Sequence, residues 1–304
     1  MSPGTAGVGR EAILQFAKHN PKHIYFTGRN ASSANSLITS LSTIFPNRIT
    51  FIPCDQTSLS SVSQTAKTLL EKSGGQLDIL VCNAGVMAIP TGVSKDGYEI
   101  QFAINHLAHA LLIKLCLPAL LKAREEKGDA RIVILTSLAF KSTSKGGIIF
   151  KDMKSDQSNL GELNPRNVYK ATCADINVGM TAKYLLYGQS KLANVLYASQ
   201  LAKLYPKLTV TAVHPGLVAG TSLADHMGLV DKLILKVVCL PLPRITLPQG
   251  AYNILWAATS MDKNLRSGGV YEPVGKPVEH TKLSADQELG KKLCDWTEKT
   301  LSAY

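Results

Sequence analysis

Short apolar segments alternate with amphipathic segments along most of this chain, and this rhythm limits the folds that it can adopt. Each apolar segment is four to six residues long and is closed by a polar or glycine residue. Nearly continuous apolar strands are typical of parallel sheets that are buried on both faces, and parallel strands need crossover connections, usually helices. The chain is therefore predicted to be an α/β protein with a doubly wound parallel sheet. The expected strands are His23–Gly28, Ile49–Cys54, Leu77–Cys82, Arg131–Leu135, Leu208–Val213 and Gly269–Val274.

The intervening segments have the spacing of helices that cover such a sheet. We find no linker and no change in composition, so residues 1–304 are predicted to form a single domain. The expected helices are Arg10–His19, the segment that ends near Leu41, Ser61–Lys72, Asp96–Arg124, Tyr187–Tyr205, Gln249–Ser260 and Ser284–Leu301.

Two segments depart from this rhythm. Residues 141–180 are polar and too long for a bare loop in a compact domain, so they are expected to form a lid or an insertion. Residues 221–248 contain an apolar stretch, Leu229–Pro243, which is expected to pack over a substrate cleft. Attachment of that stretch to a membrane surface is the alternative.

The composition limits the classes of molecule that this protein can be expected to bind. The formal net charge is +11, which suits an anionic ligand, but the 33 lysines and arginines are scattered and form no basic run interleaved with aromatics, so nucleic acid is not expected. No run of 18 apolar residues predicts a membrane-spanning helix. The six cysteines show no CxxC spacing, which favours reduced thiols, no metal site and a cytoplasmic location, with the surface of a membrane as the alternative.

The first nine residues form a glycine-rich turn that leads into a helix. Such a turn offers free backbone N–H groups to a phosphate, and its candidate contacts are Gly4, Thr5, Gly7 and Val8. A buried strand should precede the turn, yet the sequence before it is too short to supply one. We expect either that the natural protein starts further upstream, or that the sheet folds with a defect and binds its cofactor poorly.

Tyr187 and Lys191 form a pair that can carry acid–base chemistry. Residues four apart lie on one face of a helix, and a nearby ammonium stabilises a phenolate. A tyrosine tuned in this way can exchange a proton with an alcohol near neutral pH. The pair by itself is a weak signal, because a tyrosine with Lys four residues later can arise by chance.

The pair stands in an ordered set of motifs: the glycine turn, Asp55, Asn83-Ala84-Gly85, Asn105, Ser137, Tyr187 with Lys191, and Pro215-Gly216. In this order they resemble the short-chain dehydrogenase/reductase family over nearly the whole chain. The wording Tyr-Gly-Gln-Ser-Lys-Leu-Ala-Asn and the ending Val270–Lys276 are similar to the retinol-dehydrogenase-like and WW-domain-oxidoreductase-like branch. That branch includes tailoring enzymes of fungal secondary-metabolite pathways.

The resemblance implies a Rossmann-like sheet of strand order 3-2-1-4-5-6-7, with strand 1 lacking here. It implies that Tyr187 is the general acid or base, that Lys191 lowers the pKa of Tyr187 and binds the nicotinamide ribose, and that Ser137 polarises the substrate carbonyl. Asn105 would hold a water that links Lys191 to solvent. Family members often form homodimers through two helices, although the insertion could prevent this.

The cofactor can be predicted from the residues after the first predicted strand. An acidic residue there would suit NAD, whereas Arg29-Asn30 suits a 2′-phosphate, because a guanidinium matches phosphate geometry. The predicted cofactor is NADP(H). By resemblance, Asp55 would contact the adenine, Asn83, Ala84 and Gly85 the adenosine ribose, and Pro215, Gly216 and Val218 the nicotinamide. Thr221 lies one residue beyond the family's threonine position.

These observations predict an NADP(H)-dependent reductase or dehydrogenase that interconverts a ketone or aldehyde and an alcohol on a lipophilic small molecule. The alternative is a truncated, catalytically impaired or non-redox protein of the same fold, with a binding or scaffolding role. The intact Tyr187, Lys191, Ser137 and Asn105 favour the enzyme, and the missing strand favours the alternative.

Overall fold

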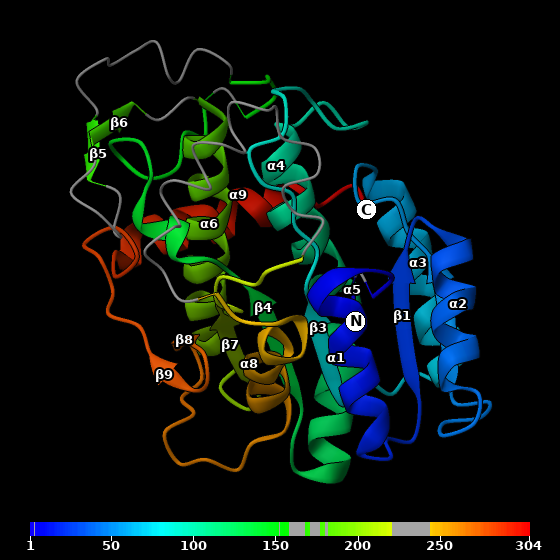
Figure 1. The fold of residues 1–304 in the computed structure, drawn as a ribbon. Helices are drawn as coiled ribbons and strands as arrows, with labels where there is room; N and C mark the ends of the chain where they lie inside the picture. The colour runs from blue at the N-terminus through cyan, green and yellow to red at the C-terminus, as the bar shows by residue number, and fades with distance from the viewer. Residues whose placement is uncertain (3, 152, 158–167, 171–176, 180–181, 221–243) are drawn as a thin grey trace.

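A computed structural model describes the chain except for residues 3, 152, 158–167, 171–176, 180–181 and 221–243 (Figure 1). Its helices are α1 (Gly7–Lys18), α2 (Ala31–Leu41), α3 (Leu59–Ser73), α4 (Ile100–Phe102), α5 (Ala108–Lys127), α6 (Ala182–Leu204), α8 (Leu247–Thr259) and α9 (Gln287–Thr300). Its strands are β1 (Ile24–Gly28), β2 (Ile49–Pro53), β3 (Ile79–Cys82), β4 (Arg131–Leu135), β5 (Val168–Lys170), β6 (Asn177–Gly179), β7 (Thr209–Val213), β8 (Val270–Glu272) and β9 (Lys276–Pro277).

The central sheet is parallel and is divided into two parts. One part has the order β1-β2, and the other has the order β3-β4-β7-β8-β9, in which only β9 runs antiparallel to its neighbour. Placed side by side, they give the predicted strand order with a gap between β1 and β3. The predicted α/β fold with a doubly wound parallel sheet is therefore confirmed.

The two residues Met1 and Ser2 occupy one end of this gap, and we call them the strand stub. The Ser2 N–H donates to the carbonyl of Val81 at 2.9 Å, and the Thr27 N–H donates to the carbonyl of Met1 at 3.1 Å. Ser2 also forms a parallel bridge with Cys82. The stub thus joins β1 to β3 at their carboxyl ends, a connection that the sequence analysis did not predict.

Helices cover both faces of the sheet (Figure 1). On one face, α1 and α8 pack against each other and against the strands, and α2 continues this layer over β1 and β2. On the other face, α3, α5, α6 and α9 enclose the largest group of buried side chains. Burial on both faces explains why the strands are almost wholly apolar.

Two helices differ from the predicted boundaries at places that matter for the site. The helix that carries Tyr187 begins at Ala182, so Tyr187 lies in its second turn and not at its start. The predicted helix over Asp96–Arg124 begins at Ile100 and contains a π-helical segment, Ala103–Leu107, before α5. Pro118 lies inside α5.

The two unusual segments are only partly described. Within the predicted insertion, β5 and β6 pair in antiparallel orientation. The apolar stretch Leu229–Pro243 lies outside the described residues, as does Thr221.

One stretch of the described chain, Ile100–Lys127, is long and apolar enough to cross a membrane by length and composition. Within its most apolar 18-residue window, 67% is buried against the rest of the protein. This is also the pattern of a core helix, and α5 packs against α3 in the layer described above.

Candidate active site

Helix α6 places Tyr187 and Lys191 beside the carboxyl end of β4. Both side chains are buried, and the Lys191 Nζ lies 5.7 Å from the centre of the Tyr187 ring. The same Nζ donates to the carbonyl of Leu135, the last residue of β4, at 3.1 Å. The Thr136 hydroxyl in turn donates to the backbone carbonyl of Lys191 at 2.9 Å. Lys191 therefore connects α6 to the end of β4 twice, once through its side chain and once through its backbone.

Ser137 follows β4 and faces the same tyrosine. Its hydroxyl accepts a hydrogen bond from the Ala139 N–H at 3.3 Å, where it caps the 3₁₀ turn Leu138–Lys141. The Ser137 side chain also lies close enough to Tyr187 to act on its phenol, in the direction that lowers the pKa of Tyr187. The predicted pair of Tyr187 and Ser137 is therefore brought together, although 50 residues separate the two in sequence.

The proton affinities of the pair differ from the prediction. Burial raises the pKa of Tyr187 to about 12, against the opposing effect of Ser137. Burial also lowers the pKa of Lys191 to about 7. The sequence analysis expected Lys191 to lower the pKa of Tyr187, but here burial outweighs any such effect, and a lysine that is only partly charged at neutral pH stabilises a phenolate weakly.

Asn105 lies in the π-helical segment, where an extra residue in the turn redirects a side chain. Its Oδ1 accepts from the Val86 N–H at 2.8 Å, and its Nδ2 donates to the Val86 carbonyl at 3.0 Å and to the Ser190 hydroxyl at 2.9 Å. A Cβ added at Gly85 would lie 3.3 Å from the Lys191 Nζ and 3.6 Å from the Asn105 Oδ1. Gly85, Asn105 and Lys191 therefore meet at one place, where glycine leaves room for both polar groups.

Three residues that the sequence analysis missed connect this cluster. The Ser190 hydroxyl donates to the Tyr187 carbonyl at 2.8 Å, and the Asn194 Nδ2 donates to the Leu135 carbonyl at 2.9 Å. The His109 Nδ1 lies 3.0 Å from the carbonyl of Asn105. The spacing of four residues from Asn105 to His109 was the available signal for the histidine, since it places both on one helix face.

The glycine turn packs tightly against β1. A Cβ on Gly4 would lie 2.3 Å from the Ile13 Cδ1, and one on Gly28 would lie 2.5 Å from the Thr5 Cγ2. Gly7 opens α1 with a φ of 55°, and the N-cap residue makes no side-chain hydrogen bond. The first turn of α1 therefore lies beside the carboxyl end of β1. Val8, which belongs to this turn, is buried.

The other predicted cofactor residues lie at the carboxyl ends of strands. Arg29 is exposed after β1 and has no acidic partner in the part of the chain that the structure describes, and the Asn30 side chain accepts from the Ser33 N–H at 2.9 Å to cap α2. After β2, Asp55 forms an ion pair with Lys95 at 2.8 Å. Burial acts to raise the pKa of Asp55, but hydrogen bonds with Lys95 and Thr57 lower it overall.

Two further groups complete this edge. The backbone N–H groups of Asn83 and Ala84 donate to the Ser2 carbonyl at 2.5 and 2.6 Å. These two hydrogen bonds fix the turn after β3 to the strand stub. After β7, Pro215 precedes Gly216, which has a φ of 92° and would carry a Cβ 2.6 Å from the Ile245 Cδ1. Val218 forms a parallel bridge with Ile245.

The sequence profile of the short chain dehydrogenases matches residues 3–151. The chain is 31% identical over 316 residues to the short-chain dehydrogenase/reductase drtF of Aspergillus calidoustus, covering 98% of this chain and 91% of that protein. It is also 31% identical to a polyprenol dehydrogenase of Danio rerio, covering 95% of this chain and 82% of that protein.

A solved structure, the NADPH-bound carbonyl reductase from chicken fatty liver, shares the fold with a TM-score of 0.61. That likeness covers 92% of this chain and 97% of the reductase at 20% identity. The ordered motifs, the divided Rossmann-like sheet and the relatives that match nearly the whole length agree. The chain is a member of the short-chain dehydrogenase/reductase family of oxidoreductases.

Proposed function

We propose that this protein is an NADP(H)-dependent oxidoreductase that interconverts a ketone or aldehyde and an alcohol on a lipophilic small molecule. The observation that carries the proposal is the buried cluster in which Ser137 acts on the phenol of Tyr187 and the Lys191 Nζ lies over the tyrosine ring. Strongly shifted pKa values together with a specific neighbouring group are characteristic of functional sites.

The residues around the cluster fit a dinucleotide. Ligands of open α/β sheets bind outside the carboxyl ends of the strands, where the strand order reverses, and here that point lies between β1 and β3. At Gly7 an added Cβ would meet nothing within 4 Å, Gly85 leaves room for Lys191 and Asn105, Gly4 lets the turn pack closely on Ile13 and Phe26, and Asp55 stands at the end of β2. The exposed Arg29 is free to meet a 2′-phosphate with a guanidinium, which matches phosphate better than a neutral hydroxyl.

NADPH, when bound, would supply a hydride to the carbonyl carbon of the substrate. Because its pKa is about 12, Tyr187 is protonated at neutral pH and can donate its proton to the carbonyl oxygen in the reductive direction. Ser137 would hold the same oxygen with a hydrogen bond that strengthens as negative charge develops. Lys191, with a pKa of about 7, can take up and release protons near neutral pH and so resupply the tyrosine.

The lipophilic substrate is supported by resemblance. One relative is named a polyprenol dehydrogenase, and its substrate class is apolar by that name. The apolar stretch Leu229–Pro243 follows the Pro215-Gly216 turn in sequence, although it lies outside the described residues. A cytoplasmic location and a homodimer remain part of the proposal.

A second candidate function is supported by the gap in the sheet. A protein of this fold that binds its cofactor weakly could serve as a binding or scaffolding protein, and the gap lies next to the glycine turn that would receive the phosphates.

Isothermal titration with NADPH and with NADH separates the two candidates. We expect NADPH to bind more tightly, and Arg29→Asp to reverse the preference, because a carboxylate repels the 2′-phosphate. Arg266→Asp is the matched control, since Arg266 is also exposed but precedes β8, at the opposite edge of the sheet. Absence of binding for both cofactors at millimolar concentration would remove the oxidoreductase proposal and leave the scaffolding one.

A further inference from the structure

The segment that follows Ser137 runs along α6, the helix that carries Tyr187. It first approaches the helix at Gly188, where a Cβ would lie 1.9 Å from the carbonyl oxygen of Ser142. We call the described residues between 138 and 157 the clasp. Ser137 thus begins the segment that holds the helix of its partner Tyr187.

Three amide groups close a ring of hydrogen bonds between the clasp and α6. The Ile149 N–H donates to the Gln189 Oε1 at 2.8 Å, the Gln189 Nε2 donates to the Gln157 Oε1 at 3.0 Å, and the Gln157 Nε2 donates to the Ile149 carbonyl at 3.0 Å. Both glutamine side chains belong to residues that are only 1% exposed. A buried carboxamide is costly to leave without a partner, so each member of the amide ring depends on the other two.

The backbone of Ile149 fixes the direction of the amide ring. A backbone N–H can only donate and a carbonyl can only accept, so the oxygen of Gln189 and the nitrogen of Gln157 must turn toward Ile149. The two groups that remain are the nitrogen of Gln189 and the oxygen of Gln157, a donor and an acceptor that face each other. The amide ring therefore has one arrangement, and a carboxylate in place of either carboxamide would lack the donor that it needs.

The backbone at Gln157 adopts a costly conformation at this place. Its φ is 48°, in the left-handed region that residues other than glycine seldom occupy. Such a conformation persists where the surrounding contacts over-determine it. In addition to the amide ring, the Gln157 N–H donates to the Ser155 Oγ at 3.3 Å, and the Gln157 Nε2 lies 3.9 Å from the Met153 Sδ. These contacts fix the end of the clasp.

Gln189 lies on the side of α6 that faces away from the catalytic pair. Successive residues of a helix turn by about 100°, so Gln189 lies about 200° around the helix from Tyr187 and about 160° from Lys191. The clasp therefore contacts the helix on the side opposite to Tyr187, whereas Ser137 at its beginning meets Tyr187 itself. A rotation of α6 that moved Tyr187 away from Ser137 would break the amide ring.

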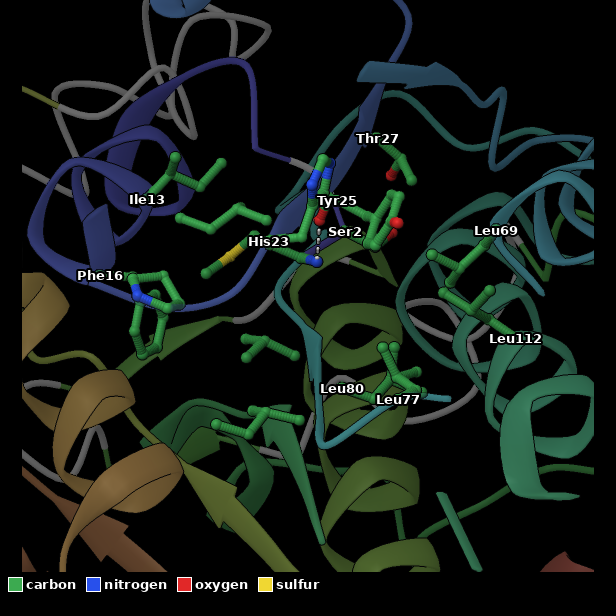
Figure 2. A pocket seen from close by; sticks show the side chains of 15 residues that line it. Ser2, Ile13, Phe16, His23, Tyr25, Thr27, Leu69, Leu77, Leu80 and Leu112 are labelled. Atoms are coloured by element: carbon green, nitrogen blue, oxygen red, sulfur yellow. Dashed lines mark hydrogen bonds between the residues drawn. The ribbon is translucent and has the colours of Figure 1, made fainter. Parts of the chain in front are cut away.

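Other elements anchor the clasp without adding a ligand site to it. The Met153 carbonyl accepts from the Glu99 N–H at 3.0 Å, and the Phe150 ring lies 5.8 Å from the Trp296 ring of α9. The clasp is not a wall of the cavity of about 120 Å³ between β1 and β3, which α1, α3 and α5 line together with the strands (Figure 2). Its effect on the active site must therefore act through α6.

We propose that Gln189 is a positioning residue of the active site. Through Gln157 and Ile149 it holds the clasp against α6, and it thereby sets the position of Tyr187 relative to Ser137. This role rests on the proposed function, in which Tyr187 and Ser137 act on the same substrate oxygen.

Gln189→Met tests this role, because methionine keeps the length of the side chain and removes both of its hydrogen bonds. We expect hydrogen exchange at the Ile149 amide to become faster by about ten-fold or more. Gln157→Met breaks the amide ring from the other side and should have the same effect, so the test does not depend on one variant. Gln200→Met is the matched control, since Gln200 bonds to the Gln287 carbonyl at 3.4 Å near the other end of α6.

Fluorine NMR of protein made with fluorotyrosine reports the position of Tyr187. The resonance of Tyr187 is the one that Tyr187→Phe removes. In Gln189→Met we expect this resonance to move toward its position in Ser137→Ala, because the serine is no longer held beside the phenol. Gln200→Met should leave it in place. With NADPH and decanal as probes, kcat of Gln189→Met should fall about ten-fold while the KM for NADPH changes little.

The proposal would be overturned by unchanged exchange at Ile149 in both ring variants, since the amide ring would then not hold the clasp. Faster exchange with an unmoved Tyr187 resonance would mean that the clasp does not position Tyr187. An equal movement of the resonance in Gln200→Met would reveal a general loosening of α6. Failure of the proposed function would appear separately, as a lack of NADPH binding by the original protein, and both NMR and exchange would still decide the role of Gln189.

Discussion

At the scale of single residues, burial dominates the chemistry of the candidate site. It raises the pKa of Tyr187 to about 12 and lowers that of Lys191 to about 7, in both cases because removal from water disfavours the charged form of the side chain. The consequence is a protonated phenol beside a lysine that titrates near neutral pH.

We expect Tyr187→Phe to lower kcat by roughly 10²- to 10⁴-fold, because the proton donor is removed. The dissociation constant for NADPH, measured by titration, should stay within a few-fold of the original. Tyr197→Phe, in the same helix and equally buried, is the control and should retain turnover, since its ring packs edge-on against His106 away from the cluster. Full turnover by the Tyr187 variant would contradict the assignment.

Lys191→Met should stabilise the cofactor-free protein at low pH. Between pH 7 and 10.5 the unfolded chain holds a proton on Lys191 that the native protein lacks, so this residue makes stability rise with pH across that window. Below pH 7 both states are protonated and the full cost of the buried charge is present, at most about 5 kcal/mol.

Urea unfolding of both proteins at pH 6 and at pH 10 measures this effect. The free energy of unfolding of the methionine variant should exceed that of the original protein most at pH 6, and this difference should become smaller toward pH 10. The Leu135 carbonyl keeps Asn194 as a donor in the variant, so no acceptor is left without a partner. An equal advantage at both pH values would show that Lys191 is not the titrating group.

At the scale of secondary-structure elements, two local features hold the site in place: the close contact of α6 with the turn after β4, and the π-helical segment. Gly188 shows the first. A Cβ at this position would lie 1.9 Å from the carbonyl oxygen of Ser142, which is backbone and cannot move aside cheaply.

Gly188→Ala should therefore destabilise the protein by about 3 kcal/mol or prevent folding, although alanine is the better helix former. Gly290→Ala in α9 is the matched control, because its Cβ would meet only the end of the flexible Gln200 side chain at 2.7 Å. Circular dichroism during urea unfolding compares the two. Similar stability for both variants would mean that α6 does not approach the turn as closely as described.

The π-helical segment directs Asn105 toward Val86 and Ser190. Asn105→Ala removes three hydrogen bonds of a buried side chain and should lower the free energy of unfolding by about 2 to 4 kcal/mol. It should also lower turnover, since Lys191 would lose an ordered neighbour. Asn30→Ala removes one exposed capping bond and should cost about 1 kcal/mol. If chemical denaturation gives equal losses for the two variants, the buried network contributes less than we infer.

At the scale of the whole molecule, the sheet consists of two parts, and within the described residues the strand stub bridges them by backbone hydrogen bonds and the helices pack across both. The part with β1 and β2 has few sheet hydrogen bonds of its own and borders the gap. A two-stranded sheet is marginal by itself.

We therefore expect β1 and β2 to open with a lower free energy than β4 and β7. Native-state hydrogen exchange followed by mass spectrometry should show faster exchange over Ile24–Pro53 than over Arg131–Leu135 and Thr209–Val213. A common opening free energy for all these strands would show that the sheet behaves as one cooperative unit in spite of the gap.

Much of the fold and part of the site could be predicted from local patterns. The apolar strands predicted the parallel sheet, and the resemblance carried by the ordered motifs implied its strand order and the residues that would gather at its carboxyl edge. The start of α6 and the π-helical segment were missed, because helix ends and π turns depend on packing that leaves little trace in periodicity. Ser190 and Asn194 were missed because their partners Asn105 and Leu135 come from distant parts of the chain, whereas His109 was missed although its spacing of four residues from Asn105 was available.

The sequence alone determined the main parallel strands and the family, and through the family resemblance their order, because strands buried on both faces need apolar residues and the motifs need particular residue types at particular spacings. Only the tertiary structure decided the protonation of Tyr187 and Lys191, since the cost of burying a charge depends on everything packed around it. It also decided how the two parts of the sheet meet, through the backbone hydrogen bonds of Met1 and Ser2, because such bonds form only where two strand edges face each other.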